Sequence, residues 1–424
     1  MQATIAQSPP SRPSFVFPVA AVLWAMALGL GLVGVFWRLT SGHEQAGYGS
    51  YIPWGLWVAG YVYFIGLSAG AFLISALVYV AGVKQLERIG KLALFTALIT
   101  LFMALVTIWF DLGHMERNWE VFVYPNPTSM MAWMIWMYTA YMILILTENW
   151  FALRSDLAKM APEAGIRGTV GRLLTFGKTD TSDEAADRDR RTLRVLGTIG
   201  VPLAIAFHGG VGALFGVIAA RPFWNSSIFP IAFIIGALAS GGGLITFVTA
   251  FFGPNRGKQE HTDLVYFLGR LVLVLLAVYL LLEWAEFSIG LYGQVPSESE
   301  PYRQILTGPY WYVFWFVHIL AGAAIPIALL AWRPRSASLV GVAAALIAVT
   351  FIAVRLNIVI PGLVMPELGG LDTAYVDNRL TFHYVPTLME WLVLLFIATA
   401  GIGALFAGTK LLPLTRGHES EGSR

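Results

Sequence analysis

The sequence predicts an all-α polytopic membrane protein of about ten transmembrane helices, and two observations carry this prediction. Of the 424 residues, 57% are hydrophobic and only 12% are charged, and the mean hydropathy is +0.69. Soluble domains have about twice that share of charged residues. Crossing the hydrocarbon core of a bilayer takes about 20 apolar residues. Runs of that kind occur near residues 15–37, 54–83, 91–113, 128–153, 194–220, 228–252, 264–291, 309–332, 336–361 and 387–408.

The distribution of basic residues predicts the orientation. Ten spans place both termini on one side, and that side has twenty Lys and Arg residues against five on the other. The remaining two, Arg270 and Arg355, fall inside spans. The positive-inside rule then puts both termini in the cytoplasm of a bacterial inner membrane. We expect the first run to stay as an uncleaved span, and the polar segment 155–192 to be a mobile cytoplasmic linker.

A faint internal duplication predicts two tandem four-helix bundles with flanking helices. Shifting the sequence by 172 residues places Ser68-Ala69-Gly70 on Ser240-Gly241-Gly242. The same shift carries three further positions onto counterparts: Tyr61 onto Phe233, Asp111 onto Glu283, and His114 onto Glu286. Internal repeats of this kind are common in membrane proteins. We expect four parts, namely 1–53 (tail and first span), 54–220 (first bundle), 221–361 (second bundle) and 362–424 (outer loop, last span and tail).

The absence of cysteine limits the cofactors that the chain can hold. With no cysteine the chain binds no iron–sulfur cluster and no thiolate metal site, so any cluster belongs to a partner. Two histidines, His208 and His318, lie deep in spans, whereas a two-haem cytochrome needs four. We therefore expect no haem and no metal. His318 is typical of a hydrogen-bonded core histidine, while His208, followed by glycines, is a candidate ligand or proton contact. No nucleotide, zinc or nucleic-acid motif is present.

Charged residues inside the spans gather toward the outer ends. A charge at the centre of a span costs roughly 2.5–3.5 kcal/mol, so such side chains should face protein or water. Asp111 and His114 are three residues apart, as are Glu283 and Glu286, and each pair is predicted to share a helix face. Desolvated carboxylates beside a histidine suit proton exchange. The alternative is that these groups only sit at the membrane interface. Further charged positions within spans are Arg355, Glu390, Glu148 and Arg270.

Four stretches together resemble one protein family. They are GLSAGAF at 66–72, DLGHMER at 111–117 followed by NPTSMMAW at 126–133, the segment 207–247 beginning FHGGVGALFG, and RLNIVIPGL at 355–363. As a set they resemble the NrfD/PsrC family, the membrane subunits of polysulfide reductase and formate-dependent nitrite reductase. The ten spans are more similar to the longer branch with DsrP and HybB.

This resemblance implies a quinone-reactive subunit that is not active alone. It implies electron exchange between menaquinone or ubiquinone and a periplasmic, ferredoxin-like iron–sulfur subunit, which serves a molybdopterin enzyme or a cytochrome. Asp111 and His114 are expected to handle protons, and the expected ring contacts are Tyr61, Ser68, Asp111, His114 and His208. Tyr61 stands where the polysulfide reductase type has a histidine.

A second polar set is a candidate proton path: Glu283, Glu286, Arg355, Glu390, Glu148 and Arg270. Two other functions stay open at this point. A secondary transporter is also built from duplicated bundles with polar groups in the membrane, and a structural anchor would have no quinone chemistry of its own.

Overall fold

The computed structural model describes residues 16–375, 377 and 379–414, and it confirms the all-helical, ten-span prediction for these residues. The basic residues of the tails, such as Arg12 and Arg424, lie outside this part of the chain. The spanning helices are α1 (Val16–Ser41), α2 (Leu56–Tyr79), α3 (Gly90–Asp111), α5 (Met130–Met160), α7 (Asp183–Gly216), α8 (Phe229–Phe252), α9 (Gln259–Gly293), η3 (Val313–Ala324) continued by α11 (Ile325–Trp332), α12 (Ala337–Val359) and α14 (Leu388–Leu411). The short helix η1 (Lys84–Ile89) leads into α3.

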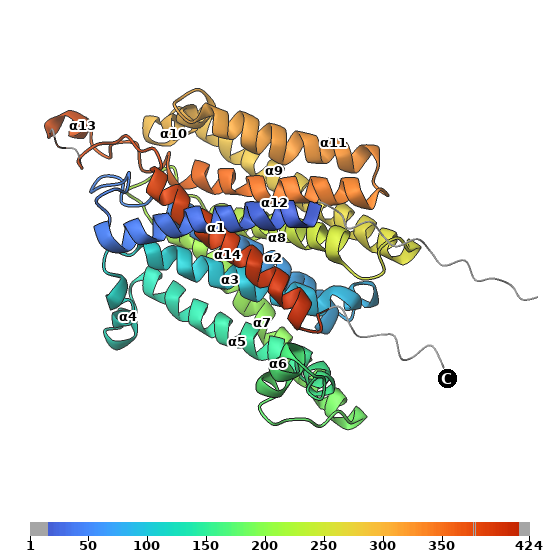
Figure 1. Cartoon of the computed structure of the whole chain (residues 1–424). Helices are drawn as coiled ribbons and strands as arrows, with labels where there is room; N and C mark the ends of the chain where they lie inside the picture. Colours follow the sequence, from blue (N-terminus) through green and yellow to red (C-terminus); the bar gives the residue numbers. More distant parts are fainter. Residues whose placement is uncertain (1–15, 376, 378, 415–424) are drawn as a thin grey trace, which may run out of the picture.

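The helices pack as two groups of four with a flanking pair (Figure 1). In the first group α2, α3, α5 and α7 contact one another, and in the second α8, α9, α12 and the η3–α11 helix do so. Helix α8 joins the groups by packing on α2 and α7. Helices α1 and α14 pack together and contact the first group through α3 and α2. This packing supports two four-helix bundles, while the boundaries of the four parts stay a prediction.

The two bundles meet where α2 crosses α8. A Cβ atom added to Gly70 would lie 2.6 Å from the Cα of Gly241, so the two backbones touch at glycines. Small residues allow such close approach between membrane helices. Arg88 of η1 and Glu260 of α9, which are 172 positions apart, form an ion pair. Gly70 and Gly241 are 171 positions apart, so this crossing does not test the 172-residue repeat, which stays a prediction.

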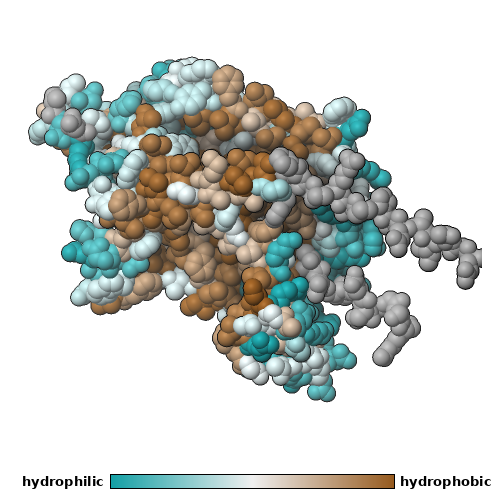
Figure 2. All heavy atoms as spheres, viewed as in Figure 1, coloured by the Kyte–Doolittle hydropathy of each residue, from teal (hydrophilic) through white to brown (hydrophobic). Residues whose placement is uncertain are grey.

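The face shown in Figure 2 has an apolar band between two polar ends. One end has the short helices η2 (Met115–Arg117), α4 (Glu120–Val123), α10 (Pro296–Leu306) and α13 (Leu371–Ala374), and we call it the α10 end (Figure 1). The opposite end has α6 (Ile166–Leu174) and is called the α6 end.

The segment 155–192, which the sequence predicts to be a mobile cytoplasmic linker, is largely helical. Helix α5 continues to Met160, α6 follows, and α7 begins at Asp183, capped by the Ser182 side chain. Arg154 is buried here, with its Nη2 2.6 Å from Asp189 Oδ2 and its Nη1 donating to the carbonyl of Asp180 at 2.7 Å. These contacts anchor the segment to α5, so a composition typical of a linker does not prevent local order.

Candidate functional site

Asp111 forms the centre of the first polar cluster at the α10 end. The hydroxyl of Tyr48 donates to Asp111 Oδ1 at 3.3 Å, and Nε2 of His43 lies 3.3 Å from that hydroxyl. Burial raises the pKa of Tyr48, and the nearby carboxylate of Asp111 adds to this. Burial, helped by the positive charge of Arg38, lowers the pKa of His43. At neutral pH both side chains are therefore uncharged, and they form a hydrogen-bonded row that ends at Asp111.

The side chain of Arg38 bonds to the backbone at the end of α3 and not to the carboxylate of Asp111. Its Nε donates to the carbonyl of Phe110 at 2.8 Å and its Nη2 to that of Leu112 at 2.6 Å. The last carbonyls of a helix have no partner within the helix, and a basic side chain at this position satisfies them. Arg38 thus fixes the end of α3, and with it the position of Asp111.

A polar cavity of about 290 Å³ opens beside this cluster at the α10 end. His43 and Tyr48 line it together with Arg379 and His383. Asp111 is therefore connected to the exterior through two side chains that can each give and take a proton.

Glu390 lies near this cluster and not with the second polar set, so its predicted grouping is wrong. Its side chain is fully buried and accepts hydrogen bonds from the hydroxyl of Tyr384 (2.6 Å), the backbone of Gly47 (3.0 Å) and the backbone of Thr387 (2.9 Å). With the Thr387 hydroxyl it forms the capping box at the start of α14. Every part of this carboxylate has a structural partner.

The predicted pairing of Asp111 with His114 on one helix face is also wrong. Helix α3 ends at Asp111, because Leu112 has an extended backbone (φ −65°, ψ 132°). His114 lies beyond that break, its side chain is 69% exposed, and its Nδ1 is 3.1 Å from Glu116 Oε1. A three-residue spacing places two side chains on one face only if the helix continues through both.

The expected ring contacts in the first bundle lie in its core. Both ring nitrogens of His208 face backbone carbonyls, Nδ1 that of Ala204 (2.6 Å) and Nε2 that of Ile65 (3.1 Å), so neither is free for a ligand. Ser68 donates its hydroxyl proton to the carbonyl of Ala97 at 2.8 Å. Tyr61 stacks against another tyrosine of the core. Of these three, Tyr61 is the one without a hydrogen bond to the backbone.

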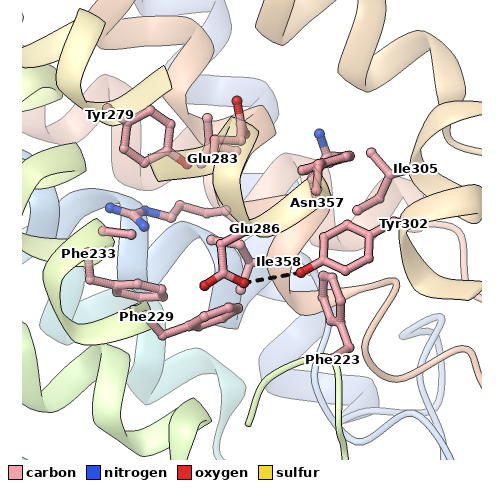
Figure 3. A pocket seen from close by; sticks show the side chains of 14 residues that line it. Phe223, Phe229, Phe233, Tyr279, Glu283, Glu286, Tyr302, Ile305, Asn357 and Ile358 are labelled. Carbon is pink, nitrogen blue, oxygen red and sulfur yellow. Dashed lines mark hydrogen bonds between the residues drawn. The ribbon is translucent and has the colours of Figure 1, made fainter. Parts of the chain in front are cut away.

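A second pocket lies between α8, α9 and α12 near the α10 end, and it brings together Glu283, Glu286 and Arg355 (Figure 3). The predicted shared face of the two glutamates is confirmed, because both line this pocket. Its walls are largely aromatic, and the rings are Phe223, Phe229, Phe233, Tyr279, Phe287 and Tyr302.

Both carboxylates of the pocket have hydrogen-bond partners. Glu283 Oε2 lies 2.7 Å from Nε2 of His318, which is 2% exposed, so the prediction of a hydrogen-bonded core histidine is confirmed. Glu286 accepts from the hydroxyls of Ser226 (2.5 Å) and Tyr302 (3.2 Å), the latter drawn in Figure 3. His318 lies in η3, a stretch of π-helix, a form often found at functional sites.

Arg355 is the unusual member of the pocket. It is 2% exposed, and its Nε and Nη1 have no hydrogen-bond partner. Its guanidinium lies over the ring of Phe233, with Cζ 4.4 Å from the ring centroid. Asn357, 8% exposed in the same wall, has an unpartnered Nδ2. Buried donors without an acceptor are costly, so these two side chains are suited to a ligand that brings acceptor atoms.

The remaining two positions of the predicted proton path are separate from both clusters. Glu148 is buried in the first bundle, where its Oε1 has no partner. Arg270 lies on an exposed side of α9, with its Nη1 donating to the hydroxyl of Tyr266 at 3.2 Å. The structure does not join them to the pocket.

Several residues of the two sites lie outside the predicted spans, and sequence reasoning missed them: His43, Tyr48, Ser226, Tyr302 and Tyr384. They come from the connections at the α10 end. The one available signal was that the outer loops are rich in Tyr, Trp, Pro and Gly with few charges.

Comparison with known proteins identifies relatives over nearly the whole chain. A selenate reductase subunit from Mesobacillus selenatarsenatis is 39% identical over 92% of this chain and 94% of the relative. The Hdr-like menaquinol oxidoreductase integral membrane subunit of Archaeoglobus fulgidus is 25% identical over 86% and 85%. The menaquinone reductase integral membrane subunit of Nitratidesulfovibrio vulgaris is 22% identical over 68% and 67%. The sequence profile of the family described as "Polysulphide reductase, NrfD" matches residues 44–367, and the chain belongs to this family.

Proposed function

We propose that this protein is the quinone-reactive membrane subunit of a respiratory oxidoreductase complex. Three findings support the proposal: the family, relatives named for menaquinol and menaquinone, and the half-buried carboxylate of Asp111 at the end of α3. The carboxylate of Asp111 carries the mechanism. Oxidation of a quinol releases two protons along with two electrons, and the reaction needs a group that takes the protons. A quinone and a quinol interconvert at this site with the direction set by the partner.

Protons pass between the quinone and the exterior through the row from Asp111 to His43. A proton taken by Asp111 moves to the oxygen of Tyr48 while the hydroxyl proton of Tyr48 moves to the neutral His43. His43 then releases it into the polar cavity that it lines. Tyr61, on the neighbouring α2, is the proposed contact for the ring.

The α10 end is the proposed outer, periplasmic side, with both chain termini in the cytoplasm. The positive-inside rule supports this, because basic residues are concentrated at the α6 end. Beyond α3 the α10 end presents exposed aromatic side chains, among them Trp119 (53%), Phe122 (52%) and Tyr124 (72%). Exposed apolar residues of this kind often mark a protein or membrane contact. We assign them to the docking of a ferredoxin-like iron–sulfur subunit, which passes electrons to a molybdopterin or cytochrome subunit; alone, the chain has no electron acceptor.

The test is quinol-driven reduction of the partner's clusters in the purified complex. Asp111→Asn keeps the size and the hydrogen bond from Tyr48 but cannot take a proton, and we expect the rate to fall at least tenfold, that is by about 1.4 kcal/mol or more in the barrier. Tyr48→Phe breaks the row and should slow the reaction in the same direction. His114→Ala is the matched control, because that histidine points into solvent, and it should leave the rate unchanged.

Binding of the inhibitor 2-heptyl-4-hydroxyquinoline N-oxide, followed by fluorescence quenching, checks the substrate class. A complex that assembles normally but reduces its clusters equally fast in the wild type and in Asp111→Asn would exclude Asp111 from the chemistry. Absence of both inhibitor binding and quinol-dependent reduction would reject the quinone function itself.

A further inference from the structure

We propose that the pocket between α8, α9 and α12, whose enclosed space of about 50 Å³ must widen on binding, is a second binding site, one that takes the ring of a quinone or quinol. Naming the ligand as a quinone rests on the function proposed above. The existence of the site rests on the pocket alone.

The unpartnered donors of the pocket require a ligand with acceptor oxygens. Arg355 is as buried as the most apolar core residues, yet two of its nitrogens have no hydrogen-bond partner, and the same holds for the amide nitrogen of Asn357. Among the described residues no carboxylate lies within ion-pair distance of Arg355, and its guanidinium instead lies over the rings of Phe233 and Phe351. A buried cation left in this state is unfavourable unless something else supplies the missing acceptors.

The walls select a flat and uncharged ring. The rings of Phe229 and Phe233 are nearly parallel, 6.0 Å apart with an interplanar angle of 28°, and Phe287 stands further along the lining. Glu283 and Glu286 line the same space, so a carboxylate or phosphate ligand would meet two acidic groups for one cation. A neutral ring with carbonyl or hydroxyl oxygens satisfies Arg355 and Asn357 without that repulsion.

The carboxylates are placed to accept hydrogen bonds from a quinol. Each of them is held by protein groups on one side, Glu283 by His318 and Glu286 by Ser226 and Tyr302, while both border the open space. In Figure 3 Glu286 lies between the rings of Phe229 and Phe233 and that of Tyr302. A quinone would thus accept from Arg355, and a quinol hydroxyl would donate to a glutamate.

The duplication provides an independent reason for a site at this place. The 172-residue shift carries Tyr61 and Asp111 of the first bundle onto Phe233 and Glu283, and both of these line the pocket. The site proposed for the first bundle therefore has a counterpart in the second bundle, at the same end of the molecule and across the α2–α8 crossing.

The experiment counts inhibitor sites in the purified complex and finds them by cross-linking. Titration with 2-heptyl-4-hydroxyquinoline N-oxide should give two sites per chain in the wild type, and a photoreactive azidoquinone should label peptides of both α2–α3 and α8–α9. Arg355→Met should lose one of the two sites and the α8–α9 label. Arg355→Lys, which keeps the charge but not the planar fork of donors, should weaken that site about tenfold or more.

Two further variants keep the outcome clear. Arg270→Met removes another arginine of the spans, on an exposed side of α9, and should bind as the wild type does. Ala232→Phe fills the pocket without removing a charge, and if Arg355→Met fails to fold this variant should still lose one site. A single site in the wild type, with no label on α8, α9 or α12, overturns the proposal and leaves a water-filled cavity. That result differs from failure of the proposed function, in which the Asp111-dependent site and quinol-driven reduction are also missing.

Discussion

Replacing Tyr384 by phenylalanine should destabilise the corner where α1, α2 and α14 meet at the α10 end. The Tyr384 hydroxyl donates to Glu390 Oε1 at 2.6 Å and accepts from the backbone N–H of Leu56 at 2.7 Å. Leu56 is the first residue of α2, so its N–H has no partner within the helix. One hydroxyl therefore caps a helix and bonds a buried carboxylate.

The magnitude follows from these two bonds. A hydrogen bond to a charged group contributes about 1.5–3 kcal/mol, and a buried N–H left without a partner costs about 1–3 kcal/mol. Because the ring is retained, no large cavity forms. Water from the neighbouring polar cavity can replace part of the loss, so we expect the free energy of unfolding to fall by about 2–5 kcal/mol.

The assay is the free energy of unfolding in lipid-containing bicelles, obtained by steric trapping, with thermal unfolding in detergent as a second measure. Tyr375→Phe is the matched control, since this tyrosine is 64% exposed, and surface changes usually stay within about 0.5 kcal/mol. If Tyr384→Phe is as stable as Tyr375→Phe, the two hydrogen bonds do not hold the corner and the reasoning is refuted.

Three other predictions concern packing, pH and the α6 end. Gly241→Ala should lower the thermal stability, because its Cβ would lie 2.5 Å from a backbone oxygen of α2, whereas Gly29→Ala, with open space around it, should be neutral or stabilising. The folded state depresses the pKa of His43 below its ordinary 6.5. The neutral form of His43 therefore contributes stability above about pH 6.5, and this stability is lost as the pH falls further. Thermal unfolding temperatures measured from pH 8 to pH 5 should drop more in the wild type than in His43→Gln. Arg154→Met removes the anchor of the segment before α7, and limited proteolysis there should become faster, with Arg190→Met, whose side chain is 77% exposed, as an unaffected comparison.

The architecture could be predicted from the sequence because the membrane imposes it. A spanning helix needs a long apolar run to satisfy its backbone, and such runs are visible without a structure. The ends of helices could not be predicted so well. The segment 155–192 is held by the buried Arg154, which pairs with Asp189, 35 positions away. Local composition does not indicate such a contact.

The site was predictable to the extent that it follows helical spacing. Glu283 and Glu286 line one pocket because α9 continues to Gly293. Asp111 and His114 do not face one another because α3 stops before the extended Leu112, and Arg38 in another helix bonds to the last carbonyls of α3. The side chain of Arg38, from a distant segment, thus stabilises the point at which the helical spacing of α3 ends.

Burial by itself does not separate structural charges from functional ones in this protein, and the hydrogen-bond partners of a buried group have to be considered together with its surroundings. Glu390 is fully buried and both oxygens of its carboxylate have protein partners, and the ring nitrogens of His208, which is 4% exposed, both face backbone carbonyls. Arg355 is 2% exposed and has two nitrogens without any. The first two hold helices together, because a satisfied buried network stabilises one arrangement. Arg355 has no such role, and under our proposal its partner is a quinone that enters and leaves the pocket between α8, α9 and α12.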